Sequence, residues 1–337
     1  MKITHIHIER FRGFQNEDFE VGSLLTAIAG QNGTQKSTLL GIITQTFTLK
    51  TEDSMRVEKP LCGGSYISAF KDKFRLSPTF DKPKGHEWTI SFDAGMDDFT
   101  VESIKRTGDP NVRFWKKGAR QEGDGYISFP TIFLSLKRLV PVAEEAKIIT
   151  DDTLLTQEEL NEFKQLHNKI LIAQTPISSA TTITSKNKQS IGVSTELYDW
   201  NQNSMGQDNL GKIILALFSF KRLHDKYPRQ YKGGILAIDE MDATMYPASQ
   251  VELLKVLRKY ASKLNLQILF TTHSMSLLKA MDDLVQEVTK KEETANQAKI
   301  LYLKKVDDKI AIKQGVNFKG IQLDLNVVAE GNNRKKN

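Results

Sequence analysis

The sequence has little cysteine and no long hydrophobic run, and each shortage excludes a class of protein. Cys62 is the only cysteine among 337 residues, so an internal disulfide is excluded, and this usage is typical of a reducing compartment. The longest strongly apolar stretch, IILALFSF at 213–220, is much shorter than the roughly 20 residues that span a membrane. The opening residues alternate polar and apolar types and lack the apolar core of a signal peptide. We therefore expect a soluble cytoplasmic protein that has no membrane partner.

The sequence also lacks a large excess of one charge and a sustained heptad repeat. The net charge is +6, from 47 basic and 41 acidic residues, in a composition ordinary for a globular protein. This small excess permits an acidic partner such as nucleic acid without requiring one. The missing heptads exclude a long coiled-coil arm.

The stretch GQNGTQKST, residues 30–38, lies between a strand-like run and a helix-like one. It fits the phosphate-binding pattern G-x-x-x-x-G-K-[ST] at Gly30, Lys36 and Ser37, but Gln35 stands where the pattern has its second glycine. If the backbone there needs a positive φ, the Cβ costs about 1–2 kcal/mol. That cost is small beside the electrostatic contribution of the lysine, of Mg²⁺ and of the N–H donors, provided the side chain points away. We interpret the loop as a variant nucleotide site with slow turnover rather than a dead one. Its expected nucleotide-binding residues are Gly30, Asn32, Gly33, Thr34, Gln35, Lys36, Ser37 and Thr38.

Two later apolar strands end in residues that carry chemistry. ILAIDE ends in Asp239 and Glu240, and LFTTHS brings His273 to the end of the next strand. Parallel sheets bind ligands at the carboxyl ends of their strands. We expect Ser37 and Asp239 to hold Mg²⁺, Glu240 to orient or deprotonate the attacking water, and His273 to contact the γ-phosphate or that water.

A second anion site is expected at the start of a long apolar helix, in NSMGQDNLGKIILALF. Ser204 and Gly206 stand at its N-terminus, where free N–H groups favour an anion. If this site cannot reach the first loop within one subunit, it can reach the loop of a neighbour.

Together these motifs resemble the ABC-type ATPase head shared by SMC, Rad50 and RecF proteins, and most of all the OLD-like and AAA15-like ATPases of prokaryotes. The resemblance implies that residues 30–38 are Walker A, with Lys36 catalytic, and that Asp239 and Glu240 are Walker B with its catalytic glutamate. It also implies a signature motif at SMGQ (204–207, Ser204 to Gln207), a D-loop at MDATMYP (241–247) and a switch histidine at His273. ERFRGF (9–14) would lie beside the nucleotide, with Arg12 contacting a phosphate or the base.

Three departures from the family pattern matter. Met205 is unusual within the signature motif, and the glutamine that contacts Mg²⁺ in the family has no assigned counterpart here. FLSLKRLVP (133–141) occupies about that junction, and none of its residues is given a role. OLD enzymes carry a TOPRIM nuclease after the head, but residues 274–337 are too few for one, so no nuclease is expected in this chain.

The expected fold is α/β: a single P-loop NTPase domain of the ABC-head type over residues 1–337, with a mainly parallel core sheet. Residues 1–60 and 200–325 would form the nucleotide-binding core. Residues 61–140 would form a β-rich layer, in which EWTISF, FTVESIK, VRFWKK and PTIFLSL make antiparallel hairpins. Residues 141–200 would be an insertion, with a helix at 156–173 and a mobile Ser/Thr-rich loop at 175–190. The final RKKN is expected to fray.

The expected activity is Mg²⁺-dependent hydrolysis of ATP to ADP and phosphate in a homodimer, or higher homo-oligomer, that sandwiches ATP. By family analogy, the setting is prokaryotic anti-phage defence or DNA maintenance, with a separately encoded effector such as a nuclease. Two alternatives stay open: a non-hydrolysing nucleotide sensor or scaffold, and the nucleotide-binding subunit of a transporter. The basic stretch VRFWKKGAR (112–120) fits either nucleic acid or a solvated hairpin. His5 and His7 share a strand face, but the sequence offers no third metal ligand at suitable spacing.

Overall fold

A computed structural model of the chain describes residues 1–66, 70–93, 95–105, 112–119, 124–139, 148–151, 154–173, 175–184 and 189–325. The chain forms two compact units. The first comprises residues 1–46, 69–126 and 269–337, and the second comprises 47–68 and 127–268. The phosphate-loop motif therefore belongs to the first unit, and the acidic pair and SMGQ belong to the second.

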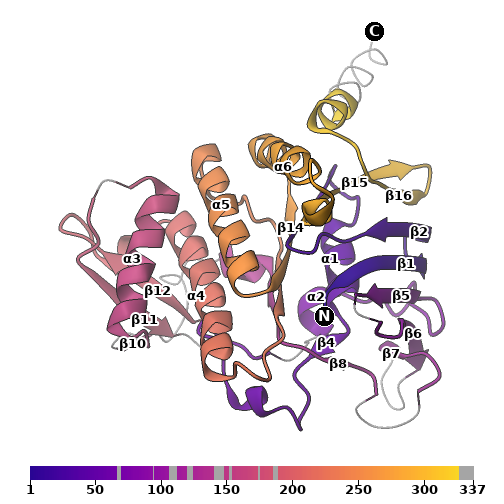
Figure 1. Ribbon diagram of the computed structural model, residues 1–337, viewed down its shortest axis with the longest axis horizontal. Coiled ribbons are helices and arrows are strands. Elements are labelled where there is room, and N and C mark those ends of the chain that lie inside the picture. Colours follow the sequence, from indigo (N-terminus) through magenta and orange to yellow (C-terminus); the bar gives the residue numbers. More distant parts are fainter. Residues whose placement is uncertain are drawn as a thin grey trace. The chain divides into compact units, whose positions relative to one another are not determined.

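The first unit contains a five-stranded antiparallel sheet in the order β2-β1-β5-β6-β7 (Figure 1). Its strands are β1 (Ile3–Phe11), β2 (Phe14–Glu20), β5 (Glu87–Phe92), β6 (Phe99–Lys105) and β7 (Val112–Lys116). The hairpins expected for EWTISF, FTVESIK and VRFWKK are confirmed. Phe11, the last residue of β1, packs against Phe74, Trp88 and Phe114 with ring centroids 5.3–5.7 Å apart. This buried aromatic cluster fixes the chain just before Arg12.

The first unit also holds one part of the mainly parallel core sheet, in the order β16-β15-β3-β14. These strands are β3 (Leu25–Gly30), β14 (Leu266–Thr272, which begins in the second unit), β15 (Ala298–Val306) and β16 (Lys309–Lys313). β15 runs parallel to β3 and pairs Leu303 with Gly30. The helices of this unit are α1 (Lys36–Thr44), α2 (Phe70–Lys73), α6 (Met275–Val288) and the short 3₁₀ turn η5 (Glu292–Thr294). The expected order of strand, loop and helix around residues 30–38 is therefore confirmed.

In the second unit, β9 (Thr131–Leu134) pairs in parallel with β13 (Gly234–Ile238). The prediction that PTIFLSL forms an antiparallel hairpin was wrong. Its residues TIFL are nearly all buried instead of alternating, which is the pattern of a parallel strand covered on both faces. As a result, the segment after β9 lies beside the segment after β13.

The insertion of the second unit contains more strand than expected. β10 (Ile149–Asp151), β11 (Ser179–Thr184) and β12 (Gln189–Ser194) form an antiparallel sheet, so the prediction of a mobile Ser/Thr-rich loop was wrong. Thr and Ile are β-branched and favour strands, and both Ile183 and Ile191 are buried. The expected helix is confirmed as α3 (Gln157–Leu171), which begins with a capping box from Thr156 to Glu159.

α3 packs against α4 (Met205–Lys226) and α5 (Pro247–Lys263) (Figure 1). The remaining short elements of this unit are β4 (Phe47–Thr48), β8 (Ile127–Ser128) and the 3₁₀ turns η1 (Ser54–Val57), η2 (Leu136–Leu139) and η4 (Trp200–Gln202). Over the described ranges, no helix combines the length and apolar character needed to cross a bilayer. The RKKN tail lies outside the described residues.

Candidate functional site

Gln35 adopts the backbone conformation that a glycine would supply. It is the N-cap of α1, with φ 62° and ψ 32°, in the left-handed region. The positive φ considered from the sequence is therefore confirmed, with its cost of about 1–2 kcal/mol for a residue that carries a Cβ. The loop keeps its shape despite the missing glycine.

The remainder of the loop has the tight geometry of a phosphate loop. Lys36 is only 8% exposed, and its Nζ donates to the carbonyls of Gly30 and Gln31 at 3.0 Å each. Thr34 Oγ1 donates to the Gln31 carbonyl at 2.8 Å. Gly30 has φ 152°, and a Cβ there would lie 2.4 Å from the Leu303 carbonyl of β15, so only glycine fits. The Lys36 side chain is thus held against the backbone of the loop that is predicted to bind the phosphates.

The Gln35 side chain packs against the turn of ERFRGF. A Cβ on Gly13 would lie 2.9 Å from Gln35 Nε2 and 2.7 Å from Ile310 Cγ1. Gly13 follows Arg12, which has φ 51°, and together they form the tight turn between β1 and β2. The two motifs, 22 positions apart in the sequence, are therefore in direct contact.

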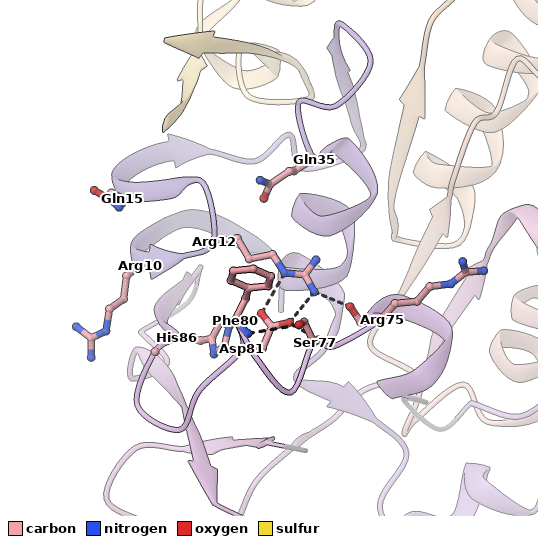
Figure 2. A pocket seen from close by; sticks show the side chains of 10 residues that line it. Arg10, Arg12, Gln15, Gln35, Arg75, Ser77, Phe80, Asp81 and His86 are labelled. Carbon is pink, nitrogen blue, oxygen red and sulfur yellow. Dashed lines mark hydrogen bonds and ion pairs between the residues drawn. The ribbon is translucent and has the colours of Figure 1, made fainter. Parts of the chain in front are cut away.

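Arg12 is the centre of a hydrogen-bonded cluster in the first unit (Figure 2). Its Nε and Nη2 each donate to a carboxylate oxygen of Asp81 at 3.1 Å, and Nη2 also donates to the Arg75 carbonyl at 2.7 Å. Its Nη1 lies 3.4 Å from Thr38 Oγ1, on the helix that follows the phosphate loop. Asp81 also contacts His86 Nε2 at 3.0 Å. The guanidinium therefore has a fixed direction, next to a residue predicted to bind nucleotide.

Ionisation in this cluster follows from burial and its partners. Burial opposes the charge on Asp81, but hydrogen bonds from Arg12, the Ser77 N–H and His86 outweigh it and lower the pKa of Asp81. Burial lowers the pKa of His86 against the pull of Asp81. At neutral pH, Asp81 is therefore the anion that holds Arg12.

A pocket of about 630 Å³ extends from this cluster to Gln35 (Figure 2). It is in the size range of small-molecule sites. Its lining residues are Arg10, Arg12, Gln15, Gln35, Arg75, Ser77, Phe80, Asp81, Gly85 and His86. The Arg75 side chain points away from Arg12, so only its carbonyl joins the cluster (Figure 2). The pocket gives space beside Arg12, which is predicted to contact a phosphate or the base.

His273 follows β14, the strand next to β3 in the first unit. It is exposed, while Ser274 caps α6 by accepting from the Leu277 N–H at 3.2 Å. Neighbouring parallel strands end at the same sheet edge, so His273 and the phosphate loop occupy the same edge of this unit. The γ-phosphate contact of His273 stays a prediction.

Asp239 and Glu240 follow the fully buried strand β13 in the second unit. The Asp239 N–H donates to the Leu134 carbonyl of β9 at 3.0 Å, and Asp239 is nearly buried. Glu240 has φ 50°, so the chain turns sharply here into the MDATMYP segment. Both acids therefore lie at the carboxyl end of a buried strand, as expected.

Arg138, from the turn after β9, is the functional residue that the sequence left without a role. It is 2% exposed, and its Nη2 donates to the Glu240 carbonyl at 2.8 Å while its Nε donates to Asn209 Oδ1 at 2.7 Å. Burial lowers the pKa of Arg138 to about 10, although the carboxylates of Asp239, Glu240 and Asp242 raise it. It remains protonated at neutral pH. Asn209 Nδ2 donates in turn to the Ala243 carbonyl at 3.0 Å.

The SMGQ motif forms the N-terminus of α4, as expected. Ser204 Oγ accepts from the Gln207 N–H at 3.4 Å, and the Ser204 N–H donates to Gln207 Oε1 at 2.8 Å, which makes a capping box. Met205 is 48% exposed. Gly206 is buried, and a Cβ there would lie 2.5 Å from the Thr244 carbonyl. The signature helix and the MDATMYP segment therefore touch at a position where only glycine fits.

The structure thus joins the predicted residues in two groups. The first unit gathers residues 30–38, Arg12 and His273, and the second gathers Asp239, Glu240 and residues 204–207. Two signals could have identified Arg138 and Asn209: a basic residue just after a buried strand, and an amide within an apolar helix. Neither signal predicts a contact with Glu240 unless β9 is known to pair with β13.

Ser37 and Asp239 stay the predicted ligands of Mg²⁺. Within the described ranges, no group of three or more His, Cys, Asp or Glu side chains is placed to hold a metal ion. His5 Nε2 and His7 Nδ1 instead contact the Asp18 carboxylate at 3.2 and 3.0 Å. The hydrogen bond to Asp18 raises the pKa of His7.

Comparisons with known proteins agree with this geometry. Residues 134–278 match the AAA_15 family of AAA ATPase domains. No curated protein matches the chain in sequence. The SMC head domain from Thermotoga maritima is similar in structure, with 14% identity and a TM-score of 0.51 over 94% of this chain and 100% of that one. An SMC head bound to the C-winged helix domain of ScpA is also similar, with 13% identity and a TM-score of 0.52 over 96% of this chain and 100% of that one.

The chain therefore has the fold of an SMC head, an ABC-type P-loop ATPase fold. The resemblance and the fold class expected from the sequence are both confirmed. The family match falls in AAA_15, one of the two groups that the motifs resemble most.

Proposed function

We propose that this chain, a P-loop ATPase with the fold of an SMC head, binds ATP with Mg²⁺ and hydrolyses it to ADP and phosphate. The observation that carries the proposal is the conformation of Gln35. It holds the left-handed backbone of the missing glycine directly before α1, and Lys36 is seated across the loop. A sequence that no longer bound phosphate would have no reason to keep a strained residue at this position.

The residues of the first unit supply the phosphate contacts. The N–H groups of residues 33–38 and the N-terminus of α1 favour anionic oxygens, and Lys36 adds a full positive charge. Arg12 would contact a phosphate or the base, and the pocket beside it has space for the base. His273, at the same sheet edge, would contact the γ-phosphate.

Ser37 and Asp239 would hold Mg²⁺. Their hydroxyl and carboxylate oxygens are the hard ligands that this ion prefers, and Asp239 is almost removed from bulk water. When bound, the ion would neutralise charge on the phosphates. Glu240 would orient the attacking water and accept its proton, from a backbone that Arg138 holds in place.

The signature motif would act on the ATP of a second copy of the chain. Ser204 and Gly206 stand at the N-terminus of the 22-residue helix α4, beside the exposed side chain of Met205. A homodimer, or a higher homo-oligomer, would then close around ATP and open after hydrolysis. This cycle would control a separately encoded effector such as a nuclease, in prokaryotic anti-phage defence or DNA maintenance.

Phosphate release at saturating ATP and Mg²⁺ tests the proposal on the full chain. We expect the wild-type protein to turn over slowly. Lys36→Ala should lose nucleotide binding, whereas Glu240→Gln should keep binding and lose at least tenfold in rate. Equal phosphate release from the wild type and Glu240→Gln would contradict hydrolysis at this site.

The strain at Gln35 also favours a second candidate, a nucleotide sensor that does not hydrolyse ATP. In that case ATP would bind and drive dimerisation, and Glu240→Gln would leave both unchanged. Phosphate release and analytical ultracentrifugation, run on the same two proteins, separate the candidates.

A further inference from the structure

A chain of hydrogen bonds in the second unit joins the signature helix to the backbone of the catalytic glutamate. We name it the Arg138 bridge: Arg138, Asn209, and the carbonyl groups of Glu240 and Ala243. Arg138 contacts Glu240 and Asn209 at 2.8 and 2.7 Å, and Asn209 contacts Ala243 at 3.0 Å. The bridge therefore makes one connection at Glu240 and another three residues later.

Arg138 itself is anchored to the sheet. Its Nη1 donates to the carbonyls of Leu134 and Ser135, at 3.2 and 3.1 Å, at the end of β9. The planar guanidinium directs its N–H groups in fixed directions, so one side chain holds β9, α4 and the turn after β13 in one geometry. A lysine in its place would offer a flexible point charge.

A second contact links α4 to the turn after β13. Gly206 on α4 lies so close to the turn after β13 that an added Cβ would stand 2.5 Å from the Thr244 carbonyl. Gln250 Nε2 holds the far side of the turn by donating to the carbonyls of Asp242 and Met245, at 3.2 and 2.9 Å. We therefore expect a displacement of the N-terminus of α4 toward this turn to shift the backbone at Glu240.

We propose that Arg138 is a positioning residue that couples the signature motif to Glu240 within one subunit. This inference rests on the proposed ATPase function. When Ser204 and Gly206 engage the ATP of the partner subunit, the Arg138 bridge carries the shift of α4 to the backbone of Glu240. The glutamate is then aligned for its own water only in a closed dimer, because an error of about 1 Å in such a group costs on the order of 100-fold in rate.

The strained backbone of Glu240 makes it sensitive to this coupling. Its φ of 50° is costly for a residue with a Cβ and persists only where neighbours impose it. The Arg138 hydrogen bond to its carbonyl is one such restraint. Removing the bridge should release the turn without touching the phosphate loop.

Arg138→Lys and Asn209→Ser, singly and combined, test the coupling. We expect each single variant to lower kcat by 10- to 100-fold while ATP affinity changes less than threefold. The double variant should be no slower than the slower single variant, because both act through one bridge.

Arg222→Lys is the matched control. Arg222 is also on α4 and donates to Glu159 and to the Leu154 carbonyl, but far from the signature motif. It should lower stability and leave kcat within twofold.

Amide hydrogen exchange on the nucleotide-free chain separates this inference from the proposed function. Arg138→Lys should speed exchange in residues 205–209 and 240–245 and leave 250–260 unchanged. If Arg138→Lys fails to fold, Asn209→Ser decides, because it removes only the amide. A wild type without ATPase activity but with this exchange pattern would refute the function and keep the bridge. Unchanged exchange in both segments, full activity in both single variants, or losses that multiply in the double variant would overturn the inference.

Discussion

Gln35 shows that a residue with a side chain can adopt the left-handed backbone that a glycine would supply at this position. Its φ of 62° is strained for any residue with a Cβ, and its amide packs against the turn at Gly13. The sequence identified both the anomaly and its energetic scale. It could not identify the packing against Gly13, because that contact depends on how β1 and α1 lie in space.

Gln35→Gly should relieve about 1–2 kcal/mol of strain and lose about 0.5–1 kcal/mol through the flexibility of glycine. We therefore expect a gain of up to about 1.5 kcal/mol in the free energy of unfolding, together with a severalfold increase in kcat. Urea unfolding and phosphate release measure the two effects. Asn16→Gly, at an exposed residue with φ 54°, is the control for strain away from the loop. A fall in both stability and rate would show that the side chain of Gln35 is required.

Among the helices and strands, those with local signals were predictable. α3 was expected from the charged helical stretch 156–173, α1 from the helix-like run after the loop, and α4 from the long apolar run after SMGQ. β9 was assigned to the wrong sheet because it pairs with β13, about 100 positions away. The residue pattern of TIFL does not indicate which strand it pairs with. Arg138 was missed for the same reason, since its partners are 71 and 102 residues away.

α3 carries a buried titratable group whose charge should limit stability in acid. His167 is 2% exposed and stacks on Phe163, and burial lowers its pKa to about 4. The unfolded chain binds a proton near the ordinary pKa of about 6.5, so between about pH 6.5 and 4 it binds more protons than the native state. The free energy of unfolding is therefore not reduced by His167 above about pH 6.5, and it decreases as the pH falls from about 6.5 to 4.

The expected loss from His167 is about 2 kcal/mol between pH 7.5 and pH 5. Urea unfolding of the wild type and of His167→Gln at both pH values measures it, and the variant should show the smaller decline. His224→Gln is the control, because His224 belongs to the same unit and its side chain is 44% exposed. Parallel declines in all three proteins would disprove the role of His167.

In the proposed dimer, the exposed surface around SMGQ must fit against the phosphates of the opposing subunit. Met205 is the exposed apolar residue of SMGQ, and Met205→Glu would bring a negative charge to the phosphates of the opposing subunit. We expect ATP-dependent dimerisation to weaken at least tenfold and hydrolysis to fall with it, while the single chain still binds ATP.

Analytical ultracentrifugation of Met205→Glu, with Val306→Glu as the control, measures dimerisation with and without ATP. Val306 is exposed to the same extent, 47% against 48%, but lies on the β15–β16 hairpin. Loss of ATP-dependent association in both variants would indicate a general effect of the added charge. Retention in both would contradict a signature-mediated dimer.

The crowding at Gly13 also constrains how relatives of this protein can diverge. An alanine at position 13 would place its methyl group 2.7 Å from Ile310 Cγ1 and 2.9 Å from Gln35 Nε2, so Ile310 and the end of the Gln35 side chain would both have to shift. A variant with glycine at position 35 would keep only the contact with Ile310. We therefore expect position 13 to tolerate an alanine only where residue 310 is also made smaller.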